Sequence, residues 1–258
     1  MPRFAANLSM MFNEVPFLDR FQKAKEAGFE AVEYLFPYDF PADEIAARLQ
    51  KFNLTQALFN LPPGGWAKGE RGLAAFPERA AEFDAALETA LPYAKATGVK
   101  KIHMMAGLAD RKNPMAAASY KNAVRKAANF FAPHGIDILL EPINARGMPG
   151  YFLNDFAFAV DVINELALPN VKLQFDIFHR QIIHGDVVMA MRAMFPLIGH
   201  VQVASVPSRH EPMSEELNDA FIFAELDRLG YDGFIGCEYI PAGKTEDGLS
   251  WFQSYRPR

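Results

Sequence analysis

The sequence alternates short strand-like runs with longer helical patterns. The expected strands are Arg3 to Leu8, Ala31 to Phe36, Thr55 to Asn60, Lys101 to Ala106, Ile136 to Glu141, Val171 to Asp176, His200 to Ser205 and Phe234 to Tyr239. A turn and then a segment with helical periodicity follow each of them. Such a repeat favours parallel strands joined by right-handed crossovers. The eight expected strands are the number that closes a (β/α)8 barrel.

The expected helices have recognisable boundaries. They span Val15 to Ala27, Ala42 to Phe52, Phe76 to Thr97, Ala116 to Ala132, Asn154 to Leu166, Asp186 to Phe195, Glu215 to Leu229 and Thr245 to Phe252. Gly28 and Gly98 follow the first and third helices as stops, and Pro41 precedes the second, where proline is tolerated. Pro92 lies inside the third helix, where it predicts a kink or a break.

Length and composition suit a single α/β domain spanning residues 1–258, since barrels of this kind typically have about 250 residues. Half of the residues are hydrophobic and 22% are charged, so the chain can bury a large core. The formal net charge of -5 argues against a nucleic-acid partner, because phosphate contacts need a basic face. The single cysteine, Cys237, excludes an internal disulfide and a thiolate metal site.

The N-terminal residues Met1 to Asn7 lack the apolar segment of a signal peptide. A run of about 18 apolar residues, which a membrane span requires, does not occur in the sequence. We therefore expect a cytoplasmic protein that does not bind membranes. The sequence leaves the oligomeric state open, and a homo-oligomer is compatible with it.

Polar side chains occur at the ends of four consecutive expected strands. Glu141, Asp176 and Glu238 each follow apolar strand residues, and Gln202 lies in the seventh strand. The carboxyl ends of barrel strands meet at one mouth, where such barrels do chemistry. A lone carboxylate there is more often a helix cap or a surface ion pair, but four polar ends in succession are harder to explain in that way. We therefore expect a site for a small, oxygen-rich molecule.

Two connections after strands are longer than a turn. The first, residues 61–72, combines several glycines with a tryptophan and an arginine, and it is a candidate lid because loops after strands lie on the catalytic face. The second, residues 207–213, places Arg209 beside the same mouth. Either could instead be a stiff surface loop.

Five segments together resemble the hydroxypyruvate isomerase family, which belongs to the larger group of xylose-isomerase-like TIM barrels. They are Phe4 to Phe12, Trp66 to Gly72, Glu141 to Asn144, Asp176 to His179 and Gly236 to Tyr239. The resemblance extends over nearly the whole chain, and it depends on the order and spacing of motifs that are individually weak. It implies a single xylose-isomerase-like TIM barrel and an aldose–ketose type isomerase. The implied substrates are hydroxypyruvate and tartronate semialdehyde (2-hydroxy-3-oxopropanoate).

The resemblance also implies a divalent metal site. Carried over by position, the ligands are Glu141, Asp176, Gln202 and Glu238, and the related sugar epimerases have histidine in place of the glutamine. An all-oxygen ligand set suits Mg²⁺ or Mn²⁺ better than Zn²⁺. Loss of the imidazole leaves open whether the metal is required.

Moving a carbonyl group between adjacent carbons removes one proton and adds another, through an enediolate. We assign the acid and base roles to Glu141 and Glu238, without deciding which acts first. The resemblance implies that Arg209 contacts substrate oxygens, and that His179 hydrogen-bonds either a substrate oxygen or a group next to the ligands of the ion. Arg71 is assigned to the substrate carboxylate, because the planar fork of arginine fits one, and Trp66 to closure of the pocket. His103 could line the pocket or pack in the core, and His200, deeper in the barrel, could lie behind the ligands or simply pack in the core.

Three alternatives stay open. Gly65 and Ile240 stand where the family pattern has aspartate and lysine, so the substrate could be a longer oxo-acid or ketose, as in 2-oxo-tetronate isomerases or ketose 3-epimerases. Metal-dependent apurinic endonucleases share the barrel, but they have a histidine-rich zinc site on a basic surface, and this chain is acidic. A non-catalytic binding barrel would keep its ligand affinity after glutamine replaces Glu141 and Glu238.

Overall fold

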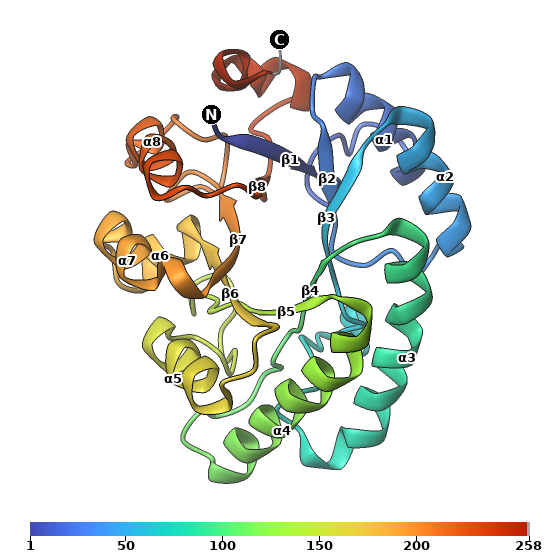
Figure 1. The fold of residues 1–258 in the computed structure, drawn as a ribbon. Helices are drawn as coiled ribbons and strands as arrows, with labels where there is room; N and C mark the ends of the chain where they lie inside the picture. The colour runs from blue at the N-terminus through green and yellow to red at the C-terminus, as the bar shows by residue number, and fades with distance from the viewer. Residues whose placement is uncertain (257–258) are drawn as a thin grey trace.

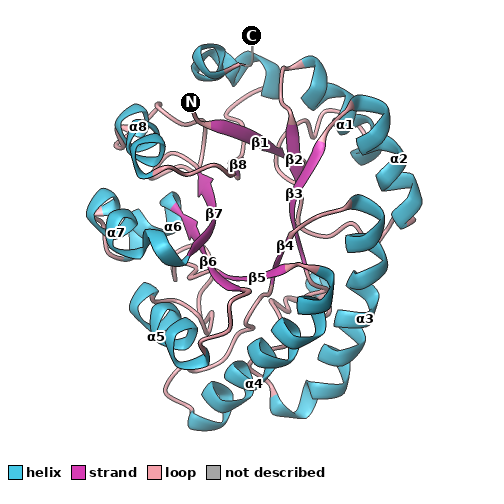
Figure 2. Ribbon diagram, in the orientation of Figure 1, coloured by secondary structure: helices cyan, strands magenta, loops and turns pink. Residues whose placement is uncertain are grey.

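The computed structural model describes residues 1–256. Its parallel strands form a closed barrel, in which each strand pairs with the next along the chain and the last returns to the first (Figure 1). The strands are β1 (Arg3–Asn7), β2 (Ala31–Glu33), β3 (Thr55–Asn60), β4 (Lys101–His103), β5 (Asp137–Leu140), β6 (Val171–Asp176), β7 (Ile198–Val203) and β8 (Phe234–Cys237). The helices lie outside this ring of strands (Figure 2). The predicted (β/α)8 barrel is confirmed.

The α-helices follow the expected order, with one addition. They are α1 (Phe17–Glu26), α2 (Ala42–Phe52), α3 (Ala80–Thr97), α4 (Pro114–Phe131), α5 (Phe156–Leu166), α6 (Ile177–Ile183), α7 (Val187–Met194) and α8 (Asp219–Leu229). The 3-10 helices are η1 (Trp66–Lys68), η2 (Pro77–Arg79), η3 (Ala132–His134), η4 (Phe195–Leu197) and η5 (Thr245–Tyr255). The sequence did not predict α6, and the last expected helix is the 3-10 helix η5. Within residues 1–256, no helix combines the length and hydropathy that a bilayer span needs.

Pro92 does not break α3, which is continuous on both sides of it. Proline removes one backbone hydrogen bond from a helix interior. The apolar face of α3, which includes Phe83, Leu87 and Ala90, is buried against the rest of the protein. Tertiary packing of this face stabilises the helix more than a single missing hydrogen bond destabilises it.

Strands β2, β4 and β8 are shorter than the sequence predicted, and β4 shows why. It ends at His103, because the residues that follow turn toward the connection between β3 and α3, where Ala106 forms an antiparallel bridge with Gly72. A Cβ atom at Gly72, whose φ is +120°, would lie 2.3 Å from the carbonyl oxygen of Met105. Only glycine permits this approach. The candidate lid is therefore anchored at its C-terminal end.

The barrel wall is buried on both faces, and β1 shows the arrangement. Its outward residue Phe4 packs edge-to-face on Phe223 of α8 and Trp251 of η5, with ring centroids 5.0 and 5.1 Å away. Inside the barrel, Ala5 of β1 and Ala31 of β2 lie side by side in the ladder. These small residues leave space inside the barrel for polar side chains from the strand ends.

Replacing Phe4 with alanine should destabilise the protein by about 3–5 kcal/mol, because it removes a buried aromatic side chain and leaves a cavity. Urea denaturation monitored by circular dichroism measures the change. Phe221→Ala on α8 is the matched control: its side chain is 49% exposed, so the free energy of unfolding should change by no more than about 0.5 kcal/mol. Equal effects of the two substitutions would contradict this account of the core.

Candidate active site

The polar strand ends occupy neighbouring positions at the carboxyl end of the barrel. Glu141 and Glu238 directly follow β5 and β8, Asp176 is the last residue of β6, and Gln202 lies in β7. All four side chains are buried. One ligand atom from each of Glu141, Asp176, His179 and Glu238 lies within 4.8 Å of the others. We call these four residues the mouth cluster.

Asp176 has two separate functions in this structure. Its Oδ1 accepts hydrogen bonds from the backbone N–H groups of Phe178 (2.7 Å) and His179 (3.3 Å), which caps helix α6. Its Oδ2 has no hydrogen-bond partner and faces the mouth cluster. Burial raises the pKa of Asp176 to about 6, although Arg209 and the two backbone N–H groups act in the opposite direction. The cap fixes the side chain so that one oxygen stays available.

One cationic side chain, that of Arg209, lies beside the carboxyl groups of the mouth cluster. Burial raises the pKa of Glu141 well above its usual range, and the charges of Glu238 and Asp176 raise it further. Burial also raises the pKa of Glu238 to about 8, against the effect of Arg209. The Arg209 guanidinium donates from Nη2 to Glu238 Oε2 at 2.5 Å, and it lies 3.9 Å from Asp176 Oδ2. A single arginine therefore partly offsets three buried carboxyl groups.

His179 is a neutral donor in this arrangement. The Oδ1 atom of Asn144 accepts from the backbone N–H of Gly147 at 2.7 Å, which turns its Nδ2 toward His179 Nδ1 at 2.6 Å. The backbone N–H of Asn144 also donates to Nδ1. Burial lowers the pKa of His179 well below its usual range. The proton of the neutral ring is therefore on Nε2, which lies 3.8 Å from Glu141 Oε1 and 3.7 Å from Asp176 Oδ2.

This tautomer bears on the predicted role of His179. A protonated ring nitrogen cannot be a metal ligand, although the position of His179 would allow one. The N–H group can instead donate to an oxygen held in the mouth cluster, which is one of the two contacts that the sequence led us to expect. His103, at the end of β4, also lies nearby: its Nε2 is 3.5 Å from Glu141 Oε2 and has no hydrogen-bond partner. Burial lowers the pKa of His103 to about 3, so this ring is neutral as well.

Gln202 is held from both ends of its amide group. Its Nε2 donates to Glu33 Oε1 at 2.9 Å, and its Oε1 accepts from Gln174 Nε2 at 2.6 Å. A carbonyl oxygen has two lone pairs, so one of them is still available to a ligand. Its assignment as a metal ligand stays a prediction.

Sequence analysis did not single out Glu33, which ends β2 and is completely buried. Besides Gln202, its carboxylate contacts Asn7 and His200. One signal was available: a glutamate between Val32 and Tyr34 is a charged residue inside an expected apolar strand. His200, which sequence analysis placed behind the ligands or in the core, belongs to this buried group.

Trp66 and Arg71 lie in the candidate lid and contact each other. The Arg71 guanidinium lies over the Trp66 ring, 3.8 Å from its centroid, and its Nη1 donates to the backbone oxygens of Trp66 (3.1 Å) and Glu70 (2.7 Å). Among residues 1–256, neither side chain hydrogen-bonds to the mouth cluster. The structure thus pairs them with each other, and their roles at the substrate stay predictions.

The mouth cluster fits a divalent cation. Glu141 Oε1 and Asp176 Oδ2 are buried atoms without a hydrogen-bond partner, and buried polar atoms normally have one. The carboxyl groups of Glu141, Asp176 and Glu238 offer the hard oxygen ligands that Mg²⁺ and Mn²⁺ prefer. Burial raises the pKa of all three groups, and a bound cation would favour their ionised forms.

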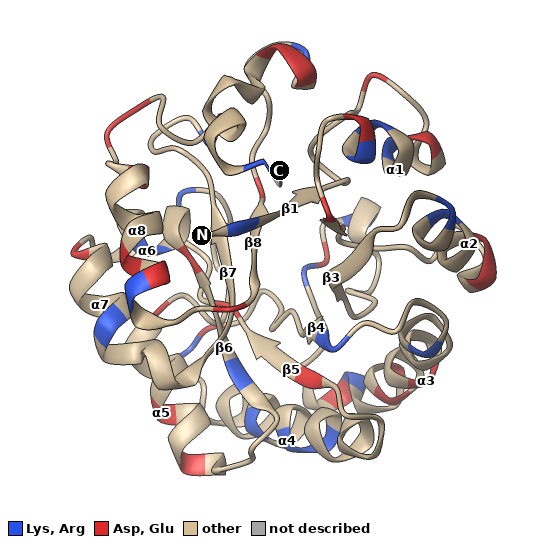
Figure 3. Cartoon of the chain, turned by 45° about the horizontal axis from the view of Figure 1, so that its top comes forward, with Lys and Arg blue, Asp and Glu red and all other residues tan. Residues whose placement is uncertain are grey.

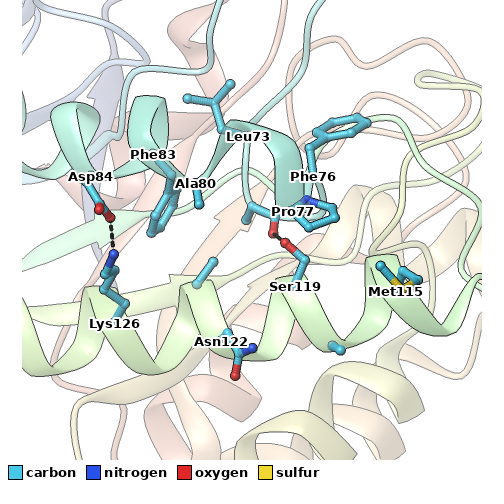
Figure 4. A pocket seen from close by; sticks show the side chains of 13 residues that line it. Leu73, Phe76, Pro77, Ala80, Phe83, Asp84, Met115, Ser119, Asn122 and Lys126 are labelled. Atoms are coloured by element: carbon cyan, nitrogen blue, oxygen red, sulfur yellow. Dashed lines mark hydrogen bonds and ion pairs between the residues drawn. The ribbon is translucent and has the colours of Figure 1, made fainter.

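A surface cavity elsewhere lacks these features. It has a volume of about 360 Å³ and lies between α3 and α4, where residues such as Phe83 and Met115 line it (Figure 4). Its charged groups, Asp84 and Lys126, pair with each other.

Acidic and basic segments alternate over the outer helices and loops (Figure 3). The convergence of titratable groups makes the barrel mouth the candidate active site.

Comparison with known proteins places this barrel in a family. Residues 21–255 match the family described as xylose isomerase-like TIM barrel, so the chain belongs to that family. Over its full length it is 52% identical to a 2-oxo-tetronate isomerase of Cupriavidus necator, and both chains are covered completely. It is 40% identical to the hydroxypyruvate isomerase of Escherichia coli, with 99% of this chain and 100% of the relative covered. The expectation of an isomerase is confirmed at the level of enzyme class.

A solved structure agrees with this fold. The crystal structure of an AP endonuclease, family 2, from Brucella melitensis superposes with a TM-score of 0.97 at 52% identity, and each chain is covered completely. An L-ribulose 3-epimerase, at 21% identity and a TM-score of 0.76, shares the fold.

The raised pKa of Glu238 predicts a pH dependence of stability in the metal-free protein. The folded state holds a proton on Glu238 up to about pH 8, whereas the unfolded chain releases it near 4.5. This group therefore stabilises the fold fully below pH 4.5, and the contribution is lost as the pH rises through about 8. Urea denaturation at several pH values in this range, with a chelator present, measures the loss.

Glu238→Gln is the comparison for this prediction, because it keeps the shape of the side chain and cannot titrate. The wild-type protein should lose more stability than the variant between the two ends of the range. Parallel pH profiles would show that Glu238 is ionised throughout.

Proposed function

We propose that this protein interconverts 3-hydroxy-2-oxo acids and 2-hydroxy-3-oxo acids by proton transfer through an enediolate. Hydroxypyruvate, with tartronate semialdehyde as its isomer, is the three-carbon member of this class, and 2-oxo-tetronate is a four-carbon member. The bond changes are the same in both, since the carbonyl moves between C2 and C3. The main support is one observation: two buried glutamates, Glu141 and Glu238, lie at one mouth with raised pKa values.

These pKa values suit acid–base catalysis near neutral pH. A general acid or base works best when its pKa is close to the working pH, and an ordinary glutamate is too acidic to hold a proton there. Burial raises the pKa of Glu238 to about 8. We assign removal of a proton from one carbon to one of the two glutamates, and return of a proton to the neighbouring carbon to the other.

Donors around the mouth cluster are suited to the oxygens of an enediolate. The Nε2–H group of His179 points toward the gap between Glu141 and Asp176, and the Arg209 guanidinium reaches Glu238 from the connection after β7. Both can donate to oxygens on which negative charge develops. Arg209 has a φ of 59°, an uncommon conformation for a residue other than glycine.

A divalent cation, Mg²⁺ or Mn²⁺, would be held by Glu141, Asp176 and Glu238 with Gln202 as the fourth ligand. When bound, it would polarise the substrate oxygens and favour the ionised forms of the carboxyl groups. The candidate lid would place Arg71 at the substrate carboxylate, and Trp66, stacked on Arg71, would move with it. We propose that the enzyme works in the cytoplasm on a small-molecule substrate.

Relatives of this chain carry the names of two members of the substrate class. Those named 2-oxo-tetronate isomerase are 52%, 46% and 44% identical to this chain, whereas the Escherichia coli hydroxypyruvate isomerase is 40% identical and a putative hydroxypyruvate isomerase of Homo sapiens is 45% identical. We therefore expect turnover of both substrates, with the higher kcat/KM for 2-oxo-tetronate. The difference should be about 10- to 200-fold, the usual effect of one small group in a pocket.

Steady-state kinetics of the purified protein with Mg²⁺ or Mn²⁺, on a panel of three- to six-carbon substrates, measures this ratio. No turnover of either acid under any metal condition would refute the proposed reaction. An abasic DNA duplex belongs in the panel, because the Brucella relative is named an AP endonuclease. Its cleavage would support the alternative.

Deuterium exchange in D₂O separates the roles of the two glutamates. Glu141→Gln and Glu238→Gln should each lower kcat/KM by about 10²- to 10⁴-fold, because each removes one proton-transfer group. The variant that keeps the base for C3 should still exchange the C3 hydrogen of hydroxypyruvate without forming product. The other should exchange the C2 hydrogen of tartronate semialdehyde. A reaction without enzyme corrects for spontaneous exchange.

Near-normal turnover by either variant would contradict the two-glutamate mechanism. Unchanged affinity for a substrate analogue in both variants, without turnover by the wild type, would instead indicate a non-catalytic binding barrel.

A further inference from the structure

Glu33 extends from β2 across the barrel interior to β7. Its Oε1 accepts from Asn7 Nδ2 at 3.0 Å and from Gln202 Nε2 at 2.9 Å, and its Oε2 lies 2.7 Å from His200 Nε2. The side chain is completely buried. Burial of a carboxylate costs several kcal/mol unless partners offset it, and an apolar residue of similar size would avoid that cost. Its hydrogen bond to Gln202 connects this buried carboxylate to the barrel mouth.

Strand β8, which lies between β1 and β7, leaves space for the side chain of Glu33. Gly236 of β8 pairs with Ala5 on one side and Gln202 on the other. A Cβ atom at position 236 would lie 2.3 Å from Glu33 Oε2 and 2.4 Å from Oε1, closer than any real contact. Glycine at this position therefore leaves the space that the carboxylate occupies, and the reach of Glu33 to β7 depends on it.

Glu33 determines which end of the Gln202 amide faces which neighbour. An amide group has a donor end and an acceptor end, and rotation by half a turn exchanges them. A carboxylate only accepts, so the NH₂ group of Gln202 must face Glu33. Its carbonyl oxygen then faces β6, where Gln174 donates to it and Asp176 is its partner in the ladder. Gln174 Oε1, at the end of this series of hydrogen bonds, has no hydrogen-bond partner.

We propose that Glu33 is a positioning residue of the mouth, which holds the carbonyl oxygen of Gln202 toward β6 for the cation. The inference rests on the proposed function, in which Gln202 is a ligand. Without Glu33, either end of the amide could face Gln174, because Gln174 can rotate with it. The ligand oxygen would then be replaced part of the time by an NH₂ group, which cannot bind a cation.

The test is the affinity for Mn²⁺, measured by electron paramagnetic resonance or titration calorimetry on the full-length protein. Glu33→Gln keeps the size of the side chain but can present a donor to Gln202. It should weaken Mn²⁺ binding by about 10- to 100-fold, the usual effect of removing a partner that orients a ligand. Asn7→Ala is the matched control, because it removes another donor to the same Oε1 atom and leaves the Gln202 contact in place. It should leave the Mn²⁺ affinity close to that of the wild type.

A reciprocal exchange separates positioning from a general structural effect. Gln202→Glu alone would place two carboxylates side by side and should bind Mn²⁺ poorly or unfold. The double variant E33Q/Q202E restores a donor–acceptor pair, and the two oxygens of a carboxylate need no orientation. It should bind Mn²⁺ more tightly than either single variant. Thermal melting of each protein confirms folding; if E33Q does not fold, Glu33→Asp, which shortens the side chain by one methylene group, replaces it.

Three results would overturn the inference. Unchanged Mn²⁺ affinity in folded E33Q, with tight binding by the wild type, would refute the role of Glu33 and leave the proposed function standing. Additive losses in the double variant would do the same, because they would show that Glu33 does not act through Gln202. Failure of the wild-type protein to bind Mn²⁺ would refute the metal site and this inference together.

Discussion

Removal of three carboxyl groups from water at one end of the barrel is the constraint on which the site depends. Desolvation is the largest cause of the raised pKa values of Glu141, Asp176 and Glu238, and repulsion by neighbouring carboxylates, Glu33 among them, adds to it. Of the described residues, Arg209 is the only cationic side chain in contact with this group, and it contacts Glu238 and Asp176. The mouth therefore favours binding of positive charge and protonation of its carboxyl groups. An enediolate reaction needs positive charge to stabilise the enediolate and groups that transfer protons.

The fold holds this unfavourable arrangement by fixing each group from outside the mouth. One oxygen of Asp176 accepts the hydrogen bond that caps α6, and Asn144 fixes the tautomer of His179. Glu33 holds the amide of Gln202 from the far side of the barrel. In each case a hydrogen bond to one end of a polar side chain leaves its other end toward the barrel mouth. Such outer contacts explain how buried polar groups keep one orientation.

Relatives that match the whole chain connect this geometry to isomerases of small oxo-acids. The names of those relatives divide between a three-carbon and a four-carbon substrate. The chemistry that the mouth supports does not distinguish the two, since the reacting carbons are the same. Substrate size would be distinguished at the rim of the mouth by the candidate lid, which carries Trp66 and Arg71 and is anchored at its C-terminal end.

The sequence by itself determined the order of strands and helices and the polar strand ends. Hydrophobic periodicity reports local burial, and burial follows the barrel repeat along the whole chain. Strand ends were less certain: β4 ends early because Ala106 pairs with Gly72, a contact between separate connections. Helix α6 was missed because its start depends on a cap by Asp176, which the strand pattern assigned only to the mouth.

Only the tertiary structure decided the partners of the polar groups. Glu33 and Gln202 are separated by 169 residues, and their contact exists because the barrel closes and Gly236 leaves space between them. The neutral state of His179 and the pairing of Arg71 with Trp66 likewise depend on neighbours that no local pattern specifies. Sequence patterns encode which residues are buried, whereas register and closure determine which buried residues meet.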